Sequence, residues 1–355
     1  MTTLSTAHPV RSLAPLVKAK RLAYLMWERP NLNKAEAFLN DFGLHTAFKT
    51  NDVLHMRGTA SAPFCYMVKK SREARFIGFG LEVEKLEDLN TLATTFNVAV
   101  QTQIKPATGH FIELTDPAGF TVHVAHGLTD LPELTTRQAM PHNTAAETPR
   151  INKTQRSNPH ADVIRLGHVV LEVANYQEVS AWYTNTFGLI PSDIQVLPDG
   201  SPAVTFFRLN LGQTPTDHHT LALAQGFMAT YSHAAFEVMD ADAVGMGQRA
   251  LRERGYKHAW GIGRHILGSQ IFDYWNDPWM SKHEHYCDGD VFTEEHPTGI
   301  HPVNREAMAQ WGQPMPSSFT KPKMTPQAIA ALSKNLKTAP DLTVKKLITL
   351  AKIFA

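Results

Sequence analysis

The sequence contains an internal repeat, and this repeat constrains the fold more than any other feature. Three segments in the first part of the chain have a counterpart in the second: residues 22–44 match 166–189, residues 79–93 match 234–248, and residues 110–127 match 270–289. The first pair has an apolar strand, a turn with Asn, an amphipathic helix and Phe-Gly-Leu. The second pair has a strand followed by a helix, and the third has two strands around an Asp-Pro turn. The repeat therefore predicts an α+β protein with two domains, each a pair of strand–helix–strands units.

Composition changes mark the boundaries of these domains. We expect an N-terminal domain over residues 20–127, a linker over 128–162, a C-terminal domain over 163–304 and a helical extension over 305–355. The linker is polar, rich in Pro and Thr, and lacks periodicity. The extension contains two amphipathic segments that begin at Thr-Pro and Asp-Leu-Thr, which are typical helix starts. They could cover one domain or form a partner-binding tail.

Charge and cysteine content exclude several classes of function. The 34 Lys and Arg residues nearly balance the 33 Asp and Glu residues, so the sequence gives no electrostatic argument for nucleic acid or an anionic membrane. Two cysteines are too few for a disulfide framework, no run of 18 apolar residues occurs, and we expect no signal peptide. These features favour a cytoplasmic protein that binds a small, weakly charged ligand.

The two halves of the repeat differ at three positions that matter for chemistry. The C-terminal half has His168, His233 and Glu284, and the N-terminal half has Tyr24, Gly78 and His123 in the corresponding places. Two neutral imidazoles and one carboxylate form a facial ligand set, which leaves three positions open on a six-coordinate divalent metal. The C-terminal half is therefore expected to bind the metal, and the N-terminal half is expected to bind none.

Glu284 stands between two other candidate ligands in the stretch His-Glu-His. Neighbouring side chains of a strand point to opposite faces of the sheet. We therefore expect Glu284 to face the metal and His283 and His285 to share the other face. The alternative, chelation by His283 and His285, stays open, although the repeat supplies no third ligand for it.

Several motifs in the second half resemble a known family. These are Gly-His with His168, the strand starting at His233, the Pro turn before Glu284, the sequence DHHT with His219, and GRH with His265 followed by Tyr274. Together they resemble the two-domain, type I extradiol ring-cleaving dioxygenases of the vicinal oxygen chelate superfamily, of the 2,3-dihydroxybiphenyl 1,2-dioxygenase kind. The resemblance covers roughly residues 20–290. One departure is that Trp279 and Met280 stand where the family usually has Ser-Gly.

The resemblance implies a fold of paired βαβββ modules that form open barrels. It also implies a cytoplasmic homo-oligomer that binds Fe(II), with Mn(II) possible on the same ligands, and that cleaves a catechol with O₂ in aromatic-compound degradation. His219 would move protons, because a histidine suits both proton uptake and release. His218 is the adjacent alternative and should point away by strand alternation. His265 and Tyr274 would hydrogen-bond the substrate hydroxyl.

Rival functions remain open at this point. A 4-hydroxyphenylpyruvate dioxygenase-like enzyme and a glyoxalase share the superfamily, and a metal-free binding module is a third class. The histidine of DHHT and the His265–Tyr274 pair favour ring cleavage, since the other enzymes do not need them. Trp275 and Trp279 would favour a flat apolar ring substituent, although core packing explains tryptophan equally well.

Overall fold

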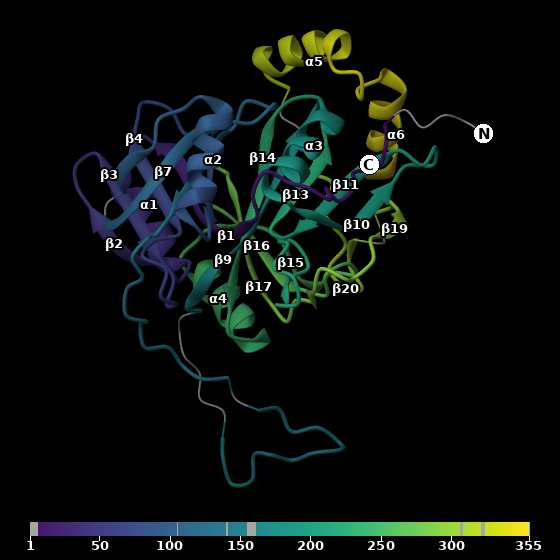
Figure 1. Ribbon diagram of the computed structural model, residues 1–355. Helices are drawn as coiled ribbons and strands as arrows, with labels where there is room; N and C mark the ends of the chain where they lie inside the picture. The colour runs from purple at the N-terminus through teal and green to yellow at the C-terminus, as the bar shows by residue number, and fades with distance from the viewer. Residues whose placement is uncertain are drawn as a thin grey trace.

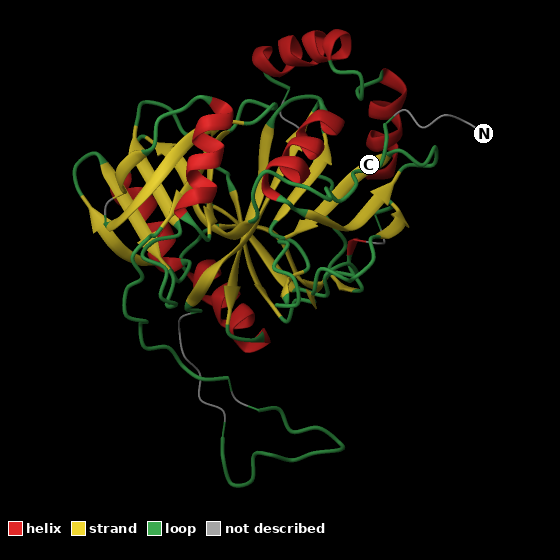
Figure 2. Cartoon of the chain, viewed as in Figure 1, coloured by secondary structure: helices red, strands yellow, loops and turns green. Residues whose placement is uncertain are grey.

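The computed structural model describes residues 6–104, 106–139, 141–154, 161–305, 308–320 and 324–354, which form two domains lying side by side (Figure 1). Each domain contains one curled β-sheet, and helices are few (Figure 2). This arrangement confirms the expected α+β class with two domains and C-terminal helices.

The N-terminal domain has an eight-stranded sheet in the order β2-β3-β4-β1-β5-β8-β7-β6. Its strands and helices are β1 (Ala19–Arg29), α1 (Leu32–Asp41), β2 (His45–Lys49), β3 (Val53–Arg57), β4 (Tyr66–Lys70), β5 (Arg75–Val83), α2 (Leu86–Phe96), β6 (Gln101–Ile104), β7 (Ala107–Thr115) and β8 (Thr121–His126). Helix α1 begins where the Asn31 side chain accepts a hydrogen bond from the Lys34 backbone, as the turn with Asn predicts.

The C-terminal domain has a ten-stranded sheet in the order β19-β10-β11-β13-β9-β14-β17-β16-β15-β20, and β12 pairs with β18 beside it. Its elements are β9 (Val163–Val173), α3 (Tyr176–Phe187), β10 (Ile190–Val196), β11 (Pro202–Arg208), β12 (Thr216–Asp217), β13 (Leu221–Gln225), β14 (Thr230–Val238), α4 (Ala241–Glu253), β15 (Lys257–Arg264), β16 (Ile271–Asn276), β17 (Lys282–Cys287), β18 (Val291–Phe292), β19 (Gly299–Pro302) and β20 (Trp311–Gly312).

Strand pairing shows the internal repeat directly. In each unit the first strand pairs in parallel with the last, as β1 does with β4, β5 with β8, β9 with β13 and β14 with β17. The two units of a domain then meet through an antiparallel pair, β1 with β5 and β9 with β14. The centre of each sheet therefore contains these four strands, and three of them carry the residues at which the two halves of the repeat differ.

The two domains share one continuous core. Trp27, Phe38 and Phe42 of the N-terminal domain belong to the same buried cluster as Phe236 of the C-terminal domain. Across the same boundary, Arg29 Nη2 donates to Asp277 Oδ2 at 2.9 Å, and both side chains are almost fully buried. Because an unpaired buried charge is strongly unfavourable, this ion pair fixes how the domains meet.

Two irregular segments lie against the domains. The residues before β1 run along the C-terminal domain, where Leu16 N donates to Asn185 O at 2.8 Å. The described part of the predicted linker has no helix or strand and extends below both domains (Figure 1). Residues 140 and 155–160 of that linker lie outside the described residues.

In the described part of the C-terminal extension, α-helix begins at Pro326. Helices α5 (Pro326–Thr338) and α6 (Val344–Phe354) begin at the two predicted starts, and the Thr325 side chain accepts from Ala328 N. Before them, β20 joins the edge of the C-terminal sheet through β15, which the prediction of a purely helical extension missed. In Figure 1 both helices lie beside the C-terminal domain, away from the N-terminal one.

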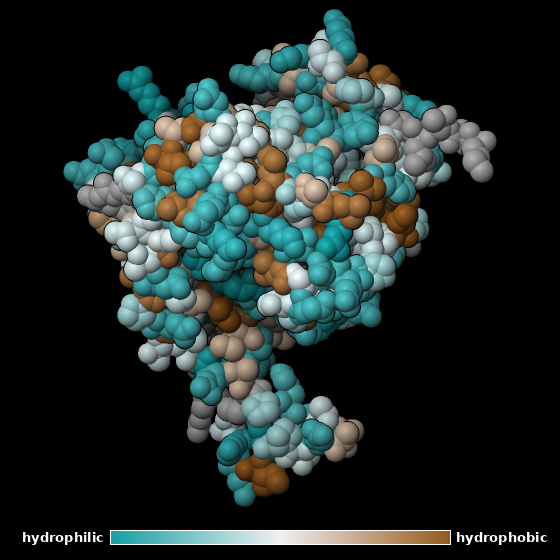
Figure 3. All heavy atoms as spheres, in the orientation of Figure 1, coloured by the Kyte–Doolittle hydropathy of each residue, from teal (hydrophilic) through white to brown (hydrophobic). Residues whose placement is uncertain are grey.

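None of the helices in the described ranges has the length and apolar character that crossing a bilayer requires. On the face seen in Figure 3, apolar residues occur in small groups separated by polar ones.

Candidate active site

Three neighbouring strands bring the candidate metal ligands together. His168 on β9 and Glu284 on β17 both stand opposite Ala235 of β14, so they lie in one row across the sheet. His233 is two residues before Ala235 and therefore points to the same face. His168 Nε2 lies 3.4 Å and His233 Nε2 3.5 Å from Glu284 Oε2. One nitrogen or oxygen atom from each residue lies within 4.8 Å of the others.

The chemistry of this donor set fits a divalent cation. Glu284 is fully buried, and neither of its carboxylate oxygens has a hydrogen-bond partner among the described residues. Burial and the nearby His168 lower the pKa of His233 well below its ordinary value, so the ring is neutral and offers a lone pair. A buried carboxylate without hydrogen bonds is unfavourable unless a cation offsets its charge. The residues present therefore fit a metal ion held by two nitrogens and one oxygen.

The two histidines beside Glu284 point away from this cluster. His283 Nδ1 donates to Ser281 O at 3.1 Å, and its Nε2 accepts from Tyr66 Oη at 3.0 Å. His285 Nε2 donates to Phe42 O at 2.7 Å, and its ring stacks on Phe42. Both rings are thus part of the contact between the domains, and Glu284 alone faces the cluster, as strand alternation predicts.

A cavity of about 620 Å³ opens beside the cluster. His168 and His233 line it, together with the three other histidine and tyrosine side chains that the sequence singled out: His219, His265 and Tyr274. Apolar side chains from β11, from residues 308–320 and from helices α5 and α6 form much of the remaining wall. The structure therefore brings all six predicted site residues to one place.

His265 and Tyr274 act as a hydrogen-bonded pair. His265 Nδ1 donates to the Met308 backbone oxygen at 2.8 Å, so its Nε2 is the acceptor for the Tyr274 hydroxyl at 2.9 Å. Burial, followed by the neighbouring Glu284 carboxylate, raises the pKa of Tyr274 well above its ordinary value. Tyr274 is consequently protonated, and its oxygen keeps lone pairs for a ligand hydroxyl.

His219 lies directly over one of the candidate ligands. Its ring centroid is 3.9 Å from that of His168. Burial, followed by repulsion from neighbouring imidazoles, lowers the pKa of His219 well below its ordinary value. The ring is therefore neutral, and one of its nitrogens has a free lone pair.

Strand alternation, which was the basis for expecting His218 to point away, does not apply at this position. Residues 218–220 lie between β12 and β13 and not within a strand, so side chains do not alternate there. His218 does not line the cavity, but it does not point away from His219 either, because the two Nδ1 atoms are 2.9 Å apart.

Comparison with known proteins agrees with this geometry. Residues 165–282 match the family model of the Glyoxalase/Bleomycin resistance protein/Dioxygenase superfamily. The matched region contains His168 and His233 and ends two residues before Glu284. Residues 165–282 thus form a glyoxalase/vicinal oxygen chelate domain.

Individual relatives extend the likeness to nearly the whole chain. Metapyrocatechase 2 from Cupriavidus necator is 26% identical over 320 residues, which are 88% of this chain and 96% of the relative. The native homoprotocatechuate 2,3-dioxygenase from Arthrobacter globiformis superposes with a TM-score of 0.71 at 17% identity, covering 90% of this chain and 96% of that one. The Mn(II)-bound glyoxalase from Novosphingobium aromaticivorans gives 0.72 at 18% identity, covering 87% and 96%. Both solved structures therefore share the fold of this chain.

In the N-terminal domain a tyrosine side chain occupies the place of the cluster. Tyr24 Oη donates to His123 Nδ1 at 3.1 Å, and His123 Nε2 donates to Glu113 at 3.3 Å. A Cβ atom added at Gly80 would come within 2.6 Å of the Tyr24 ring, so this ring packs directly against the backbone there. The expectation that the domain binds no metal stays a prediction, which metal analysis can test.

The tryptophans expected near the substrate lie elsewhere. Trp275 follows Tyr274 on β16, so it points to the other face of the ten-stranded sheet. There its Nε1 donates to Asp273 at 2.6 Å. Trp279 packs beside Arg29 at the contact between the domains. Neither lines the cavity, so of the two interpretations that the sequence left open the structure favours core packing.

Met280, which stands where the resembled family usually has glycine, has an unusual backbone conformation. Met280 adopts a left-handed conformation with φ 70°, and its N donates to Asp277 O at 2.9 Å to close the Asp-Pro turn. The corresponding turn of the N-terminal domain has Gly119 with φ 94° at this place. The methionine is therefore strained where its counterpart is not.

Proposed function

We propose that this protein is an extradiol dioxygenase that cleaves the ring of a catechol with O₂ and inserts both oxygen atoms. The observation that carries the proposal is the convergence of three groups on one cavity: the His168/His233/Glu284 cluster, His219, and the His265–Tyr274 pair. The relatives named metapyrocatechase and homoprotocatechuate 2,3-dioxygenase support the same reaction class.

His168, His233 and Glu284 would hold the metal, which we propose to be Fe(II), with Mn(II) possible on the same ligands. Three ligands on one side leave room for two catechol oxygens and one O₂. When bound, Fe(II) would supply the redox-active centre that brings an electron-rich ring and O₂ into electronic contact. The strands that carry the ligands are central in the sheet, so the protein orients the site before substrate arrives.

The remaining site residues would orient the catechol and move its proton. His219 is neutral and buried, so its free ring nitrogen would accept the proton of a catechol hydroxyl and later return it. Tyr274, with its hydroxyl hydrogen held by His265, would accept a hydrogen bond from the substrate. His219 and Tyr274 would therefore interact with different hydroxyl groups of the catechol.

The far end of the cavity supports an apolar substituent on the catechol ring. Leu332 of α5 and Leu347 and Leu350 of α6 line this end, together with Phe227. Glu172 also lines the cavity, and burial raises the pKa of its carboxyl. A carboxylate on the substrate would be desolvated beside this acid, so we propose a neutral alkyl or aryl substituent.

The test of this proposal is an anaerobic reconstitution. Protein freed of metal is loaded with Fe(II), mixed with 3-methylcatechol or 3-phenylcatechol, and then exposed to air. A yellow ring-opened product supports extradiol cleavage. An iron-loaded protein that binds the catechol anaerobically and leaves it intact in air contradicts the proposal.

A second candidate follows from the likeness to the Mn(II)-bound glyoxalase. A glyoxalase-like enzyme would isomerise a hemithioacetal with Mn(II) or Zn(II) in the same ligands and would have no need of His219 or Tyr274. Isomerase activity that survives His219→Asn and Tyr274→Phe, with no ring cleavage, would favour this candidate. The expectations of a homo-oligomer and of a cytoplasmic location stay predictions.

A further inference from the structure

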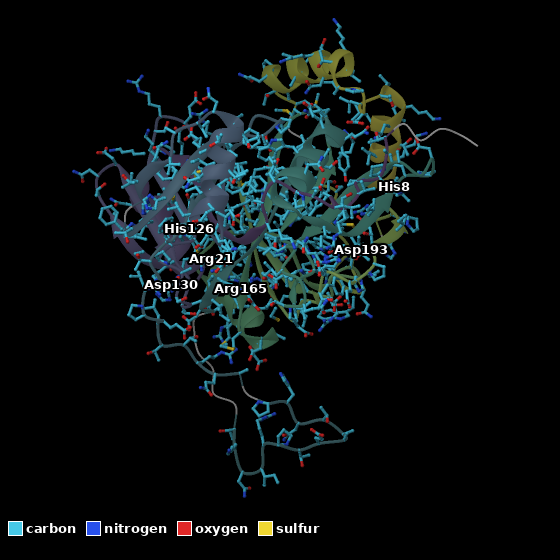
Figure 4. All side chains as sticks on the ribbon, viewed as in Figure 1. His8, Arg21, His126, Asp130, Arg165 and Asp193 are labelled. Atoms are coloured by element: carbon cyan, nitrogen blue, oxygen red, sulfur yellow. The ribbon has the colours of Figure 1, made fainter. Side chains whose placement is uncertain are left out.

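A buried chain of hydrogen bonds leads from His219 away from the cavity. The Nδ1 atoms of His219 and His218 are 2.9 Å apart, and His218 Nε2 is 2.7 Å from Asp193 Oδ2. His218 is fully buried, and Asp193 on β10 is 8% exposed. Figure 4 labels Asp193, which lies beside β10 in the C-terminal domain and away from Arg21 and Arg165.

Asp193 is the fixed end of this chain because its carboxyl is ionised. Burial acts to raise its pKa, but the hydrogen bonds from His218 and His301 outweigh burial, and the net pKa lies below the ordinary value. An ionised carboxylate can only accept hydrogen bonds. His218 Nε2 must therefore carry the hydrogen that it shares with Asp193. His301 Nε2 likewise donates to the other carboxylate oxygen at 2.7 Å.

The protonation of each ring follows in order from this end. An imidazole with a single hydrogen, placed on Nε2 by the contact with Asp193, has an acceptor at Nδ1. The facing Nδ1 of His219 must then be the donor, which leaves Nε2 of His219 without a hydrogen. His219 Nε2 has no hydrogen-bond partner among the described residues, so it is the nitrogen available to a ligand in the cavity.

We propose that Asp193 and His218 are positioning residues that fix the orientation and tautomer of His219 so that its Nε2 is a ready proton acceptor. The inference rests on the proposed function only in the use that it gives to His219; the tautomers themselves follow from the hydrogen bonds. A carboxylate that holds an imidazole in the reactive tautomer is a known requirement of proton-transferring histidines. Here the Asp193 carboxylate acts on His219 through a second imidazole, that of His218.

Packing around the pair holds it in this geometry. The Phe206 ring lies 5.4 Å from His218 and 5.0 Å from His219, between centroids. His218 N also donates to the Asp290 backbone oxygen at 2.8 Å. At Gly268 an added Cβ would come within 2.8 Å of His218 Nδ1, so the backbone there closes the space behind the ring. His218 therefore has little room to turn.

The tautomers can be read without any catalytic assay. Protein with ¹⁵N-labelled histidine is loaded with Zn(II), which is diamagnetic, and long-range ¹⁵N–¹H correlation spectra are recorded. His218→Gln and His219→Gln spectra assign the signals. We expect Nε2–H on His218 and Nδ1–H on His219 in the wild type, and a mixture of tautomers in Asp193→Asn, because an amide can also donate. A wild-type His219 with its hydrogen on Nε2 overturns the inference, as does an Asp193→Asn spectrum without change.

A kinetic arm measures what the positioning does. Asp193→Asn and His218→Gln should lower kcat on the order of 10²-fold, the lower part of the range for general acid–base help. Iron content and anaerobic catechol affinity should stay unchanged, which separates positioning from a general loss of structure. His301→Gln is the matched control, because it removes a hydrogen bond from the same carboxylate without touching the His218–His219 contact, and it should keep wild-type kcat.

The two arms keep failure of this inference distinct from failure of the proposed function. If the wild type cleaves no catechol, the proposed function falls and the spectra alone decide the tautomers. If it does cleave catechol and both Asp193→Asn and His218→Gln keep wild-type kcat, the positioning role is wrong. If His301→Gln loses as much turnover as Asp193→Asn, the carboxylate acts through general stability and the inference is also wrong.

Discussion

His168 and Glu284 lie opposite the same residue of β14, Ala235, and their side chains meet with Nε2 and Oε2 3.4 Å apart. Two separate repeat units supply these strands, so neither unit alone contains the site. The position of the cluster depends on sheet register and not on a flexible loop. A site of this kind is preformed, and changes to single ligands should alter metal binding more than folding.

The first prediction concerns the metal ligands. His168→Ala, His233→Ala and Glu284→Gln should each abolish tight Fe(II) binding, because each removes one of the three donors that converge on the site. Iron per chain after gel filtration, measured by plasma emission, gives the result.

His283→Gln and His285→Gln are the matched controls, since these side chains belong to the same strand and point to the other face. They should retain iron. Wild-type protein should hold at most one iron per chain, because Tyr24 fills the corresponding place in the N-terminal domain. Loss of iron from the controls together with retention in Glu284→Gln would reverse the assignment.

The second prediction separates catalysis from binding. His219 is placed over His168 and is not one of the three clustered donors, so His219→Asn should keep iron and anaerobic catechol affinity. Turnover should fall by about 10²–10⁴-fold if His219 supplies general acid–base help. Tyr274→Phe should be milder, because it removes a hydrogen bond and no proton-transfer group. Wild-type turnover in His219→Asn would remove the strongest support for ring cleavage beyond the ligands.

The third prediction tests the apolar end of the cavity. Leu350→Asp should raise KM for 3-phenylcatechol about tenfold, since ~1.4 kcal/mol of lost apolar contact corresponds to that factor. The KM for unsubstituted catechol should change less, because that ring would not reach α6. Ile348→Asp is the control on the same helix, as Ile348 is half exposed and does not line the cavity. Equal effects of both variants on both substrates would contradict the assignment of this wall.

The fourth prediction concerns the strained turn before β17. Met280→Gly should raise the free energy of unfolding by about 0.5 kcal/mol, because relief of the left-handed conformation outweighs the greater freedom of glycine in the unfolded chain. Gly119→Ala, in the corresponding turn, should lower it by about 1 kcal/mol, since the added methyl group meets nothing within 4 Å and only the backbone is strained. Urea unfolding measures both changes, and a stabilised Gly119→Ala would show that the φ values are not decisive.

The sequence predicted those parts of the site that follow from the internal repeat and from the alternation of side chains along a strand. The repeat located His168, His233 and Glu284, and strand alternation gave the direction of Glu284, because β17 is a regular strand. The same rule failed at His218, where the chain leaves the strand, and the direction of Trp275 was missed although it follows from that of Tyr274 on β16.

Contacts between distant segments were beyond what the sequence could predict. Asp193 meets His218 only because β10 and the segment after β12 approach each other in the folded sheet, and no spacing in the sequence marks that contact. The apolar periodicity of residues 342–354 predicted helix α6, but it did not indicate that Leu347 and Leu350 reach the cavity. Both the Asp193–His218 contact and the position of helix α6 depend on packing between segments that are far apart in the sequence.

The most direct test of the central claim is a single turnover under ¹⁸O₂. Iron-loaded protein is mixed anaerobically with 3-phenylcatechol, exposed to ¹⁸O₂, quenched early and examined by mass spectrometry. The account predicts a ring-opened product that carries both atoms of the added O₂, and none of this product with Glu284→Gln. Intact catechol, a quinone without added oxygen, or a ring-opened product with oxygen from water alone would contradict it.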